Sequence, residues 1–167
     1  MADRGLKQTL AAFGAGEPHT TTLLAAAALV DALATHPGAA VLDVGTGTGI
    51  LAALARRLGA SRAVGIERDA GLIGTGRARH PDVEFVHGDA LGDLPEGPFA
   101  IVVANLTDPP LRHLVPHLVA RLEGEIIVSG VRLWQGSALR GALERSGAIV
   151  MKVAAANGWC AYRARAR

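Results

Sequence analysis

Apolar residues occur along the chain in short continuous runs, separated by stretches with the spacing of amphipathic helices. The runs read as buried strands over residues 40–44, 63–66, 83–86, 99–104 and 126–128. The helical stretches cover about residues 20–35, 50–58, 69–79, 109–122 and 137–145. Helices that alternate with uniformly apolar strands are typical of a parallel sheet covered on both faces. The pattern therefore predicts a doubly wound α/β fold.

The end of the chain has a different pattern. Residues 149–153 and 159–162 read as two strands joined across Asn157 and Gly158, a pair that favours a tight hairpin turn. We therefore expect a mostly parallel seven-stranded sheet that closes with an antiparallel C-terminal hairpin. Residues 1–12 read as an N-terminal arm or a short helix, and residues 1–167 as a single domain.

Composition and charge narrow the class of protein. Half of the 167 residues are hydrophobic and 19% are charged, which excludes extensive disorder. The apolar run at residues 23–30 is too short to span a bilayer and no signal peptide is evident, so we expect a cytoplasmic protein without a membrane partner. The net charge is only +2, and the basic tail of Arg163, Arg165 and Arg167 reads as a solvated end. Nucleic-acid binding is therefore not expected.

Histidines and tryptophans add no further chemistry. His19, His87, His113 and His117 show no metal-binding pattern: His113 and His117 are four residues apart on one predicted helix, but no metal-binding motif accompanies them. We therefore expect surface histidines and no metal. Trp134 and Trp159 are expected to be packing anchors.

A glycine-rich loop between the first strand and the next helix is the strongest functional signal. Gly45, Gly47 and Gly49 follow Asp43, with Thr46 inside the loop. Glycines at this place let the backbone pass close to a ligand at the N-terminus of a helix. A dinucleotide fingerprint that starts at Gly45 would need its third glycine at Ile50. The spacing therefore favours S-adenosylmethionine over a nicotinamide cofactor.

Carboxylates at the ends of two further strands extend the predicted cofactor site. Glu67, followed by Arg68, ends the second strand, where such sheets recognise ribose hydroxyls. Asp89 and Ala90 follow the third strand, where a carboxylate and a backbone N–H can bind adenine. We expect Asp43 to hold the loop amides near the charged end of the cofactor. Solvated strand ends and turn caps are the alternative roles for these carboxylates.

Candidates for the methyl acceptor side lie after the fourth strand. The side-chain carbonyl of Asn105 can accept a hydrogen bond from an amine, although an asparagine here can also cap the next turn. Asp108 is a candidate base. Phe13 and Thr21, before and within the first long helix, are expected to cover or contact the cofactor, with packing and helix capping as alternatives.

Four stretches together resemble the catalytic domain of the ribosomal protein L11 methyltransferase family. Phe13 to Gly16 with Thr20 and Thr21 resembles the family's F-G-T-G-x-H-x-T-T segment, and Asp43 to Leu51 its D-x-G-x-G-x-G-I-L loop. Val102 to Leu106 with Pro110 and Leu111 resembles its V-A-N-I/L segment. Ser129 to Val131, and Trp159 with Cys160, resemble its S-G-I and E-W-C landmarks.

The resemblance implies a methyltransferase that uses S-adenosylmethionine to methylate a protein or peptide amine. Ala15 replaces a threonine of the family, Gly158 replaces a glutamate, and the histidine of the first segment is displaced by one position. The first twelve residues are too few for the family's separate N-terminal domain, which recognises the ribosomal protein. A methyltransferase for a small metabolite is therefore the main alternative, and a non-catalytic S-adenosylmethionine-binding protein is a further one. The oligomeric state stays open, with a dimer as one option.

Overall fold

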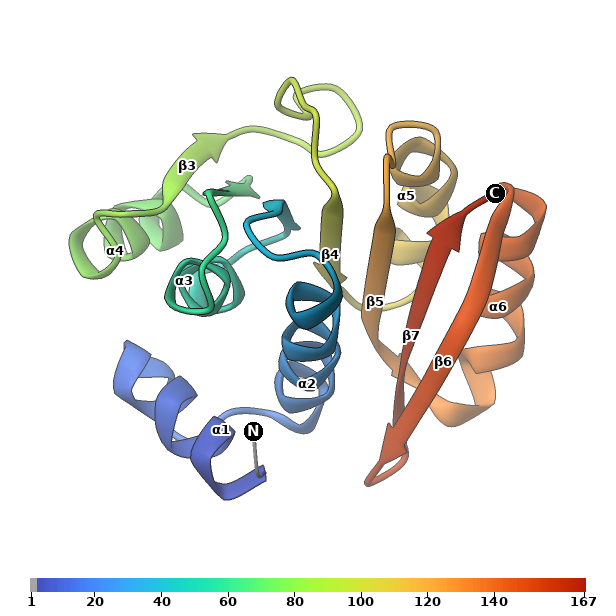
Figure 1. Ribbon diagram of the computed structural model, residues 1–167, viewed down its shortest axis with the longest axis horizontal. Helices are drawn as coiled ribbons and strands as arrows, with labels where there is room; N and C mark the ends of the chain where they lie inside the picture. Colours follow the sequence, from blue (N-terminus) through green and yellow to red (C-terminus); the bar gives the residue numbers. More distant parts are fainter. Residues whose placement is uncertain (1–2) are drawn as a thin grey trace.

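A seven-stranded sheet forms the centre of the computed structural model, which describes residues 3–167 without the side chains of residues 3, 4 and 15 (Figure 1). Its strands are β1 (Ala40–Val44), β2 (Arg62–Glu67), β3 (Glu84–His87), β4 (Ile101–Asn105), β5 (Glu125–Arg132), β6 (Ala148–Ala156) and β7 (Trp159–Ala166). They lie in the order β3-β2-β1-β4-β5-β7-β6. Neighbours from β3 to β5 are parallel, whereas β7 runs antiparallel to β5 and β6. The predicted fold class is confirmed.

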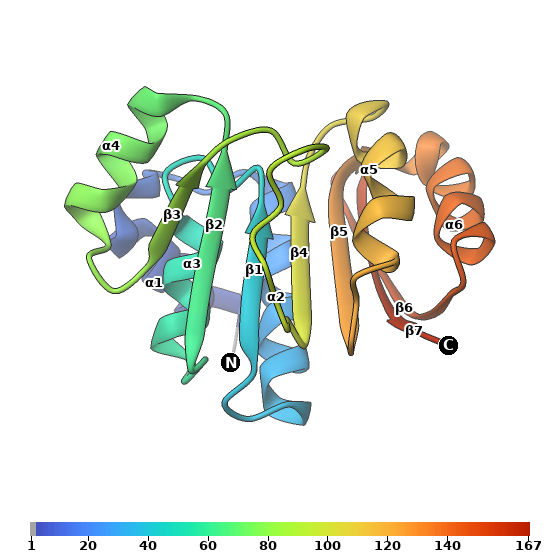
Figure 2. The same ribbon diagram turned by 90° about the horizontal axis from the view of Figure 1, so that it is seen from above.

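Helices cover both faces of this sheet (Figure 2). They are α1 (Asp3–Leu10), α2 (Thr20–Thr35), α3 (Ile50–Arg57), α4 (Ala70–Arg79), α5 (Pro110–Val119) and α6 (Gly136–Arg145). A π-helical turn, η1 (Ala11–Ala15), follows α1, and a 3-10 turn, η2 (Leu133–Gln135), precedes α6. Figure 2 shows α5 and α6 on one face and α1, α2 and α3 on the other. Because both faces are covered, the central strands are apolar on both sides.

Alternate residues of β1 show how the two faces are filled. Leu42 and Val44 belong to the apolar cluster under α5 and α6, whereas Val41 belongs to the cluster under α2 and α3. Asp43 lies between them in sequence and is 2% exposed. Side chains alternate across a strand, so Asp43 points to the same face as Val41. A carboxylate thus lies inside the molecule, next to the start of α3.

Residues 3–10 form the short helix α1, one of the two structures expected for this part of the chain. Leu6 and Leu10 are 3% and 0% exposed and join the apolar cluster under α2 and α3. Burial of two leucines stabilises the docked helix, because each fully buried leucine contributes roughly 1.5–3 kcal/mol.

Strand β5 is longer than predicted because Gly130 does not end it. Gly130 has φ +99° and lies in a bulge between Ser129 and Val131, after which pairing with β7 resumes. A Cβ at Gly130 would lie 2.2 Å from the carbonyl oxygen of Leu106. Only glycine fits both the backbone conformation and this close approach.

Two sequence-based expectations about side chains are wrong. Trp134 is 79% exposed, because η2 turns it outward, and it anchors no packing. Trp159 does pack, with the Arg132 guanidinium 3.7 Å from its ring centroid. Arg163 does not belong to a solvated tail: its side chain is 13% exposed and donates to the buried carboxylate of Glu125. The reason is that β7 continues through the tail and pairs with β5.

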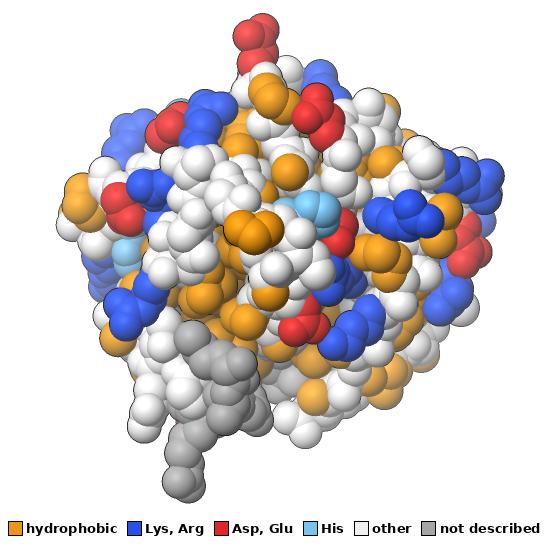
Figure 3. Space-filling model, viewed as in Figure 1, with side chains coloured by type: hydrophobic (Ala, Val, Ile, Leu, Met, Phe, Trp, Pro, Cys, Tyr) orange, Lys and Arg blue, Asp and Glu red, His pale blue; other side chains and the backbone are white. Residues whose placement is uncertain are grey.

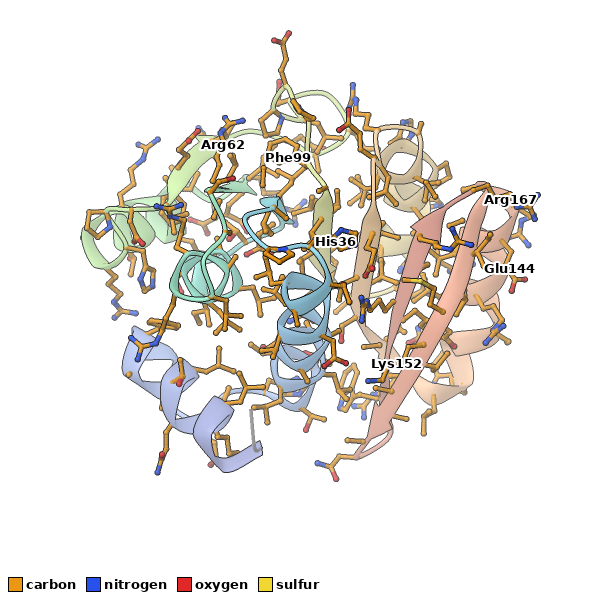
Figure 4. The ribbon with its side chains drawn as sticks, viewed as in Figure 1. His36, Arg62, Phe99, Glu144, Lys152 and Arg167 are labelled. Carbon is orange, nitrogen blue, oxygen red and sulfur yellow. The ribbon has the colours of Figure 1, made fainter. Side chains whose placement is uncertain are left out.

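A polar cluster at the amino end of β5 joins distant parts of the chain. The Glu125 carboxylate accepts from Arg163 and lies 3.0 Å from Nε2 of His36, which follows α2 (Figure 4). Arg163 also donates to the Thr35 hydroxyl at 2.9 Å. Burial raises the pKa of Glu125, but Arg163 and His36 more than offset it, so the pKa stays below the usual value. The cluster ties α2, β5 and β7 together.

Strand β6 is an outer edge of the sheet and is irregular. A bulge between Val150 and Lys152 leaves Met151 without a residue opposite it in β7. Lys152 then reaches Asp31 of α2 at 2.6 Å (Figure 4). No helix within residues 3–167 is long and apolar enough to cross a membrane.

Candidate functional site

The carboxyl ends of β1, β2 and β4 open onto one cavity of about 430 Å³. Doubly wound sheets bind their ligands at this edge, where the strand order reverses between β1 and β4. Five of the residues predicted for the cofactor line this cavity together: Gly45, Glu67, Arg68, Asp89 and Ala90. The structure thus brings the glycine loop and the two strand-end carboxylates to the same space.

The glycine loop is held from below by Asp43. The Thr46 hydroxyl donates to Oδ2 of Asp43 at 2.5 Å, and the Ala52 N–H donates to the same oxygen at 3.3 Å. The pKa of Asp43 is raised to about 6, mainly by burial. The hydrogen bonds from Thr46 and Ala52 lower this pKa, and the nearby charge of Glu67 raises it. Asp43 therefore holds the loop through the Thr46 side chain and the first turn of α3.

Glycine is required at both ends of the loop. Gly45 has φ +68°, and a Cβ there would lie 2.3 Å from Cδ2 of Leu106. Gly49 has φ +86°, and its Cβ would lie 2.5 Å from Cζ of Phe85. A Cβ at Gly47 would meet nothing within 4 Å, so the middle of the loop faces open space. The backbone is thus fixed at its ends and accessible to a ligand between them.

Glu67 links the loop to the end of β2. Its Oε2 accepts from the Gly47 N–H at 3.0 Å, and its Oε1 accepts from the N–H groups of Arg68 and Asp69 at 2.9 and 3.1 Å. A carboxylate offers about four acceptor positions, so this one keeps a position for a further donor. Glu67 is partly exposed and lines the cavity.

Asp89 and Ala90 form the wall opposite the loop. Oδ1 of Asp89 accepts from the Leu91 N–H at 2.8 Å, which is the turn-capping role expected as its alternative. The Asp89 N–H donates to Asp93 at 2.8 Å, so the backbone there is also held. Oδ2 of Asp89 has no hydrogen bond to any described residue and is open to a donor in the cavity.

Asn105 lies at the carboxyl end of β4, next to the first turn of α2. Its Nδ2 donates to the Thr22 hydroxyl at 3.3 Å, whereas its Oδ1 is buried without a partner among the described residues. Thr21 is 6% exposed, its hydroxyl lies 2.9 Å from Nδ1 of His19, and its carbonyl accepts from Ser129 at 3.1 Å. A buried acceptor without a donor is costly, so Oδ1 is suited to bind one.

Asp108 is held by two neighbours. One of its oxygens accepts from Arg112, and the other accepts from Nε2 of Gln135 at 3.2 Å. These bonds engage both oxygens and tie the loop before α5 to η2. They favour a structural role for Asp108 over the base role expected from the sequence.

The structure does not bring Phe13 to the cofactor cavity. Its ring makes an edge contact with His80, with the ring centroids 5.6 Å apart, and it lines a different cavity. The reason is that η1 carries Phe13 toward the C-terminal ends of α3 and α4. Cofactor coverage by Phe13 is therefore not supported by this arrangement.

One wall of the cavity consists of residues that were not predicted from the sequence. Leu106, Thr107, Pro110, His113 and Leu114, from the loop after β4 and the start of α5, line it opposite β2. Their only signal was position, because they directly follow the strand-end residue Asn105. The four histidines expected at the surface, His19, His87, His113 and His117, are exposed, and the described residues hold no cluster suited to a metal ion.

Comparison with known proteins identifies relatives that belong to one family of methyltransferases. The family model of ribosomal protein L11 methyltransferase (PrmA) matches residues 9–167. A ribosomal protein L11 methyltransferase of Myxococcus xanthus (strain DK1622) is 40% identical over 153 residues, which cover 89% of this chain and 52% of that protein. Its counterpart in Ralstonia pickettii (strain 12J) is 40% identical over 126 residues, covering 72% of this chain and 40% of that protein. The chain thus spans about half the length of these relatives or less.

Solved structures agree with these relatives. A ribosomal protein L11 methylase from Lactobacillus delbrueckii subsp. bulgaricus superposes with a TM-score of 0.83 at 27% identity, over 90% of this chain and 81% of that one. A TehB-like SAM-dependent methyltransferase from Corynebacterium glutamicum superposes with a TM-score of 0.72 at 18% identity, over 99% and 97% of the two chains. The second likeness concerns the fold alone.

Proposed function

Since the chain belongs to the ribosomal protein L11 methyltransferase family, we propose that it binds S-adenosylmethionine and methylates an amine nitrogen of a protein or peptide. One observation carries the proposal: Gly45 of the glycine loop, Glu67 and Asp89 line a single cavity at the switch in strand order. A protein substrate is supported by the relatives, which are ribosomal protein L11 methyltransferases.

The residues around the cavity fit the groups of this cofactor. Glu67 has acceptor capacity for ribose hydroxyls, and the open oxygen of Asp89 suits the adenine amino group. The open face of Gly47 lets a ligand approach the loop backbone, as the methionine part requires. Gly45, Arg68 and Ala90 line the same cavity, whereas Thr46 and Gly49 are not among its lining residues and Thr21 lies in the first turn of α2.

When bound, S-adenosylmethionine would supply a methyl group on a sulfonium: an in-line amine would attack that methyl carbon, with S-adenosylhomocysteine as the leaving group and the surplus proton released to solvent. The chain then has to hold a neutral amine in line with that methyl group. The buried Oδ1 of Asn105 can accept one N–H of the amine, while Thr22 fixes the amide from its other side. This contact would direct the nitrogen lone pair without any covalent intermediate.

The test uses cofactor with a labelled methyl group. The protein is incubated separately with the protein fraction and the small-molecule fraction of a bacterial lysate, and we expect label in the protein fraction. Label only among small molecules would assign the protein to metabolite methylation. Calorimetric binding of S-adenosylhomocysteine without any labelled product would indicate a non-catalytic binding protein, and binding of NAD alone would overturn the proposal.

Asn105→Ala tests the acceptor side. We predict that turnover falls about 10-fold or more, because a directional contact to the nucleophile is lost. Affinity for S-adenosylhomocysteine should stay within about 2-fold of wild type, since a change of that size is below the effect of one hydrogen bond. Gln8→Ala, which removes an exposed side-chain amide outside the cavity, serves as the control. Full turnover in the Asn105 variant would remove this residue from the acceptor role.

A further inference from the structure

A second cavity, of about 530 Å³, lies away from the cofactor cavity and shares no lining residue with it. The C-terminal ends of α3 and α4 and the turn η1 enclose it. Figure 1 shows these three elements close together on the side of the sheet that α1 covers. The side chains that matter here are Phe13, Arg56, Arg57, Arg79, His80 and Asp82.

Positive charge dominates this cavity. Arg56, Arg57 and Arg79 contribute three guanidinium groups, and Asp82 is the one acidic side chain among its lining residues. Each of the two helix C-termini adds roughly half a negative charge, which the last-turn arginines of α3 and α4 balance. About one positive charge remains after this balance, so the cavity attracts an anion. Figure 3 shows Lys and Arg side chains gathered over α4, at the left of that view.

Two nitrogens in the wall of this cavity have no hydrogen-bond partner within the described part of the chain. They are Nε2 of His80, whose residue is 6% exposed, and Nε of Arg56. The Arg56 guanidinium is fixed by donating Nη1 to the Ser61 carbonyl at 2.6 Å, and its Nε lies 3.9 Å from Asp82, beyond hydrogen-bond reach. Buried donors are costly unless they are satisfied. The Nε–H of Arg56 therefore calls for an acceptor, and Nε2 of His80 can donate to one in the tautomer that carries its proton there.

From this geometry we infer that the second cavity binds the phosphate group of a small ligand. A phosphate monoester offers three acceptor oxygens to the guanidinium groups and to His80. The cavity volume lies in the range of small-molecule sites. The ring of Phe13, which packs against His80, provides an apolar wall for the organic part of such a ligand.

The contacts of the cavity suggest how its ligand would bind. Arg79 donates to the Gly14 carbonyl at 3.2 Å, so the side chain closes one end of the cavity against η1. Arg57 lines the same cavity and is exposed in the last turn of α3. The two guanidinium groups are thus both available to an anion in the cavity, while Arg56 stays bound to its own loop.

The test is calorimetric titration of the full chain with phenyl phosphate, inorganic phosphate and phenol, without and with saturating S-adenosylhomocysteine. We expect phenyl phosphate to bind in both conditions and phenol not to bind. Arg57→Gln and Arg79→Gln should each weaken binding about 10-fold, the loss of one charged hydrogen bond. Arg145→Gln is the matched control, an exposed arginine in the last turn of α6. It should bind as wild type does.

The outcomes separate this site from the cofactor cavity and from other ligands. If inorganic phosphate binds as tightly as phenyl phosphate, the anion site is supported and its ligand is the free phosphate ion. No binding of either phosphate, or equal weakening in Arg145→Gln, would overturn the inference. Competition by S-adenosylhomocysteine would also overturn it, because the phosphate would then occupy the cofactor cavity. Much tighter binding of a single-stranded RNA in the same titration would overturn the assignment of a small ligand in favour of a nucleic-acid polymer. Failure of S-adenosylhomocysteine to bind would count only against the proposed methyl transfer.

Discussion

At the scale of single residues, Glu67 has two tasks. It accepts three backbone N–H groups, one from the glycine loop and two from the end of β2. The same carboxylate is the proposed ribose ligand. A carboxylate already fixed by backbone donors loses little freedom when a ligand arrives, so its hydrogen bonds to the ligand are used efficiently.

We predict that Glu67→Ala weakens S-adenosylhomocysteine binding by about 1.5–3 kcal/mol, the range for hydrogen bonds to a charged group. Calorimetry measures the change. Glu67→Gln keeps one acceptor and should lie between the alanine variant and wild type. Glu96→Ala, which removes an exposed carboxylate outside the cavity, should bind normally. Wild-type affinity in Glu67→Ala would exclude this residue from the cofactor site.

The buried Asp43 makes stability depend on pH. Burial raises its pKa from 3.8 to about 6, so the folded state holds the proton more tightly than the unfolded chain. The contribution of Asp43 to stability is therefore complete below pH 3.8 and is lost as the pH rises through 6. One pKa unit corresponds to about 1.4 kcal/mol, so the ionised carboxylate costs the fold about 3 kcal/mol.

We predict that Asp43→Asn changes this pH dependence. The free energy of unfolding of wild type, relative to the variant, should fall by about 3 kcal/mol between pH 4 and pH 7. Urea unfolding at several pH values measures it. A constant difference across this range would show that Asp43 keeps its ordinary pKa in the folded protein.

At the scale of elements, the glycine loop and α3 form one unit. Gly49 begins α3 in a left-handed conformation, and Phe85 of β3 fills the space where a side chain would lie. The loop, the helix and the third strand therefore depend on one another. The cofactor binding that we propose at the loop would thus be coupled to packing at the edge of the sheet.

Gly49→Ala tests this coupling. We predict destabilisation of about 2–4 kcal/mol, from the positive φ and from the clash with Phe85. Gly38→Ala is the control, because Gly38 has φ +74° but no atom within 4 Å of its Cβ position. Gly38→Ala should lose only the stability that the positive φ costs a non-glycine residue, about 1 kcal/mol. Thermal unfolding measures both, and equal losses would show that the contact with Phe85 has no effect.

Elements of the fold could largely be predicted because each central strand is covered on both faces and is therefore apolar throughout. Residues such as Glu67 and Asp89 could be placed because parallel strands end at the same edge. Positions that are determined by tertiary contacts could not be predicted from the sequence. The burial of Leu10, the continuation of β5 through Gly130 and the outward turn of Trp134 have no local signal in the sequence.

At the scale of the whole molecule, the Glu125 cluster connects residues far apart in the chain. Arg163 and Glu125 have side chains only 13% and 8% exposed, and His36 and Thr35 complete the contacts from the end of α2. Removing one partner of a buried ion pair leaves the other charge uncompensated. The last strand is thus tied to the end of the first long helix by Arg163, directly through Thr35 and indirectly through Glu125 and His36.

We predict that Arg163→Ala lowers the free energy of unfolding by about 3 kcal/mol near pH 7, the low end for breaking a buried pair. Because Arg163 helps to lower the pKa of Glu125, the difference from wild type should shrink as the pH falls through that pKa. Urea unfolding measures it. Arg165→Ala, an exposed change in the same strand, should alter stability by less than about 0.5 kcal/mol. Equal losses in the two variants would contradict the role of the pair.

The extra residue in β6 has a consequence for how copies of the protein meet one another. An exposed edge strand with a regular row of free amide and carbonyl groups can pair with the edge strand of a second molecule, and repeated pairing of this kind builds fibres. Met151 interrupts that row midway along the strand, and Lys152 beside it adds a charge. Crowded molecules can therefore collide along this edge without joining into a continuous ladder.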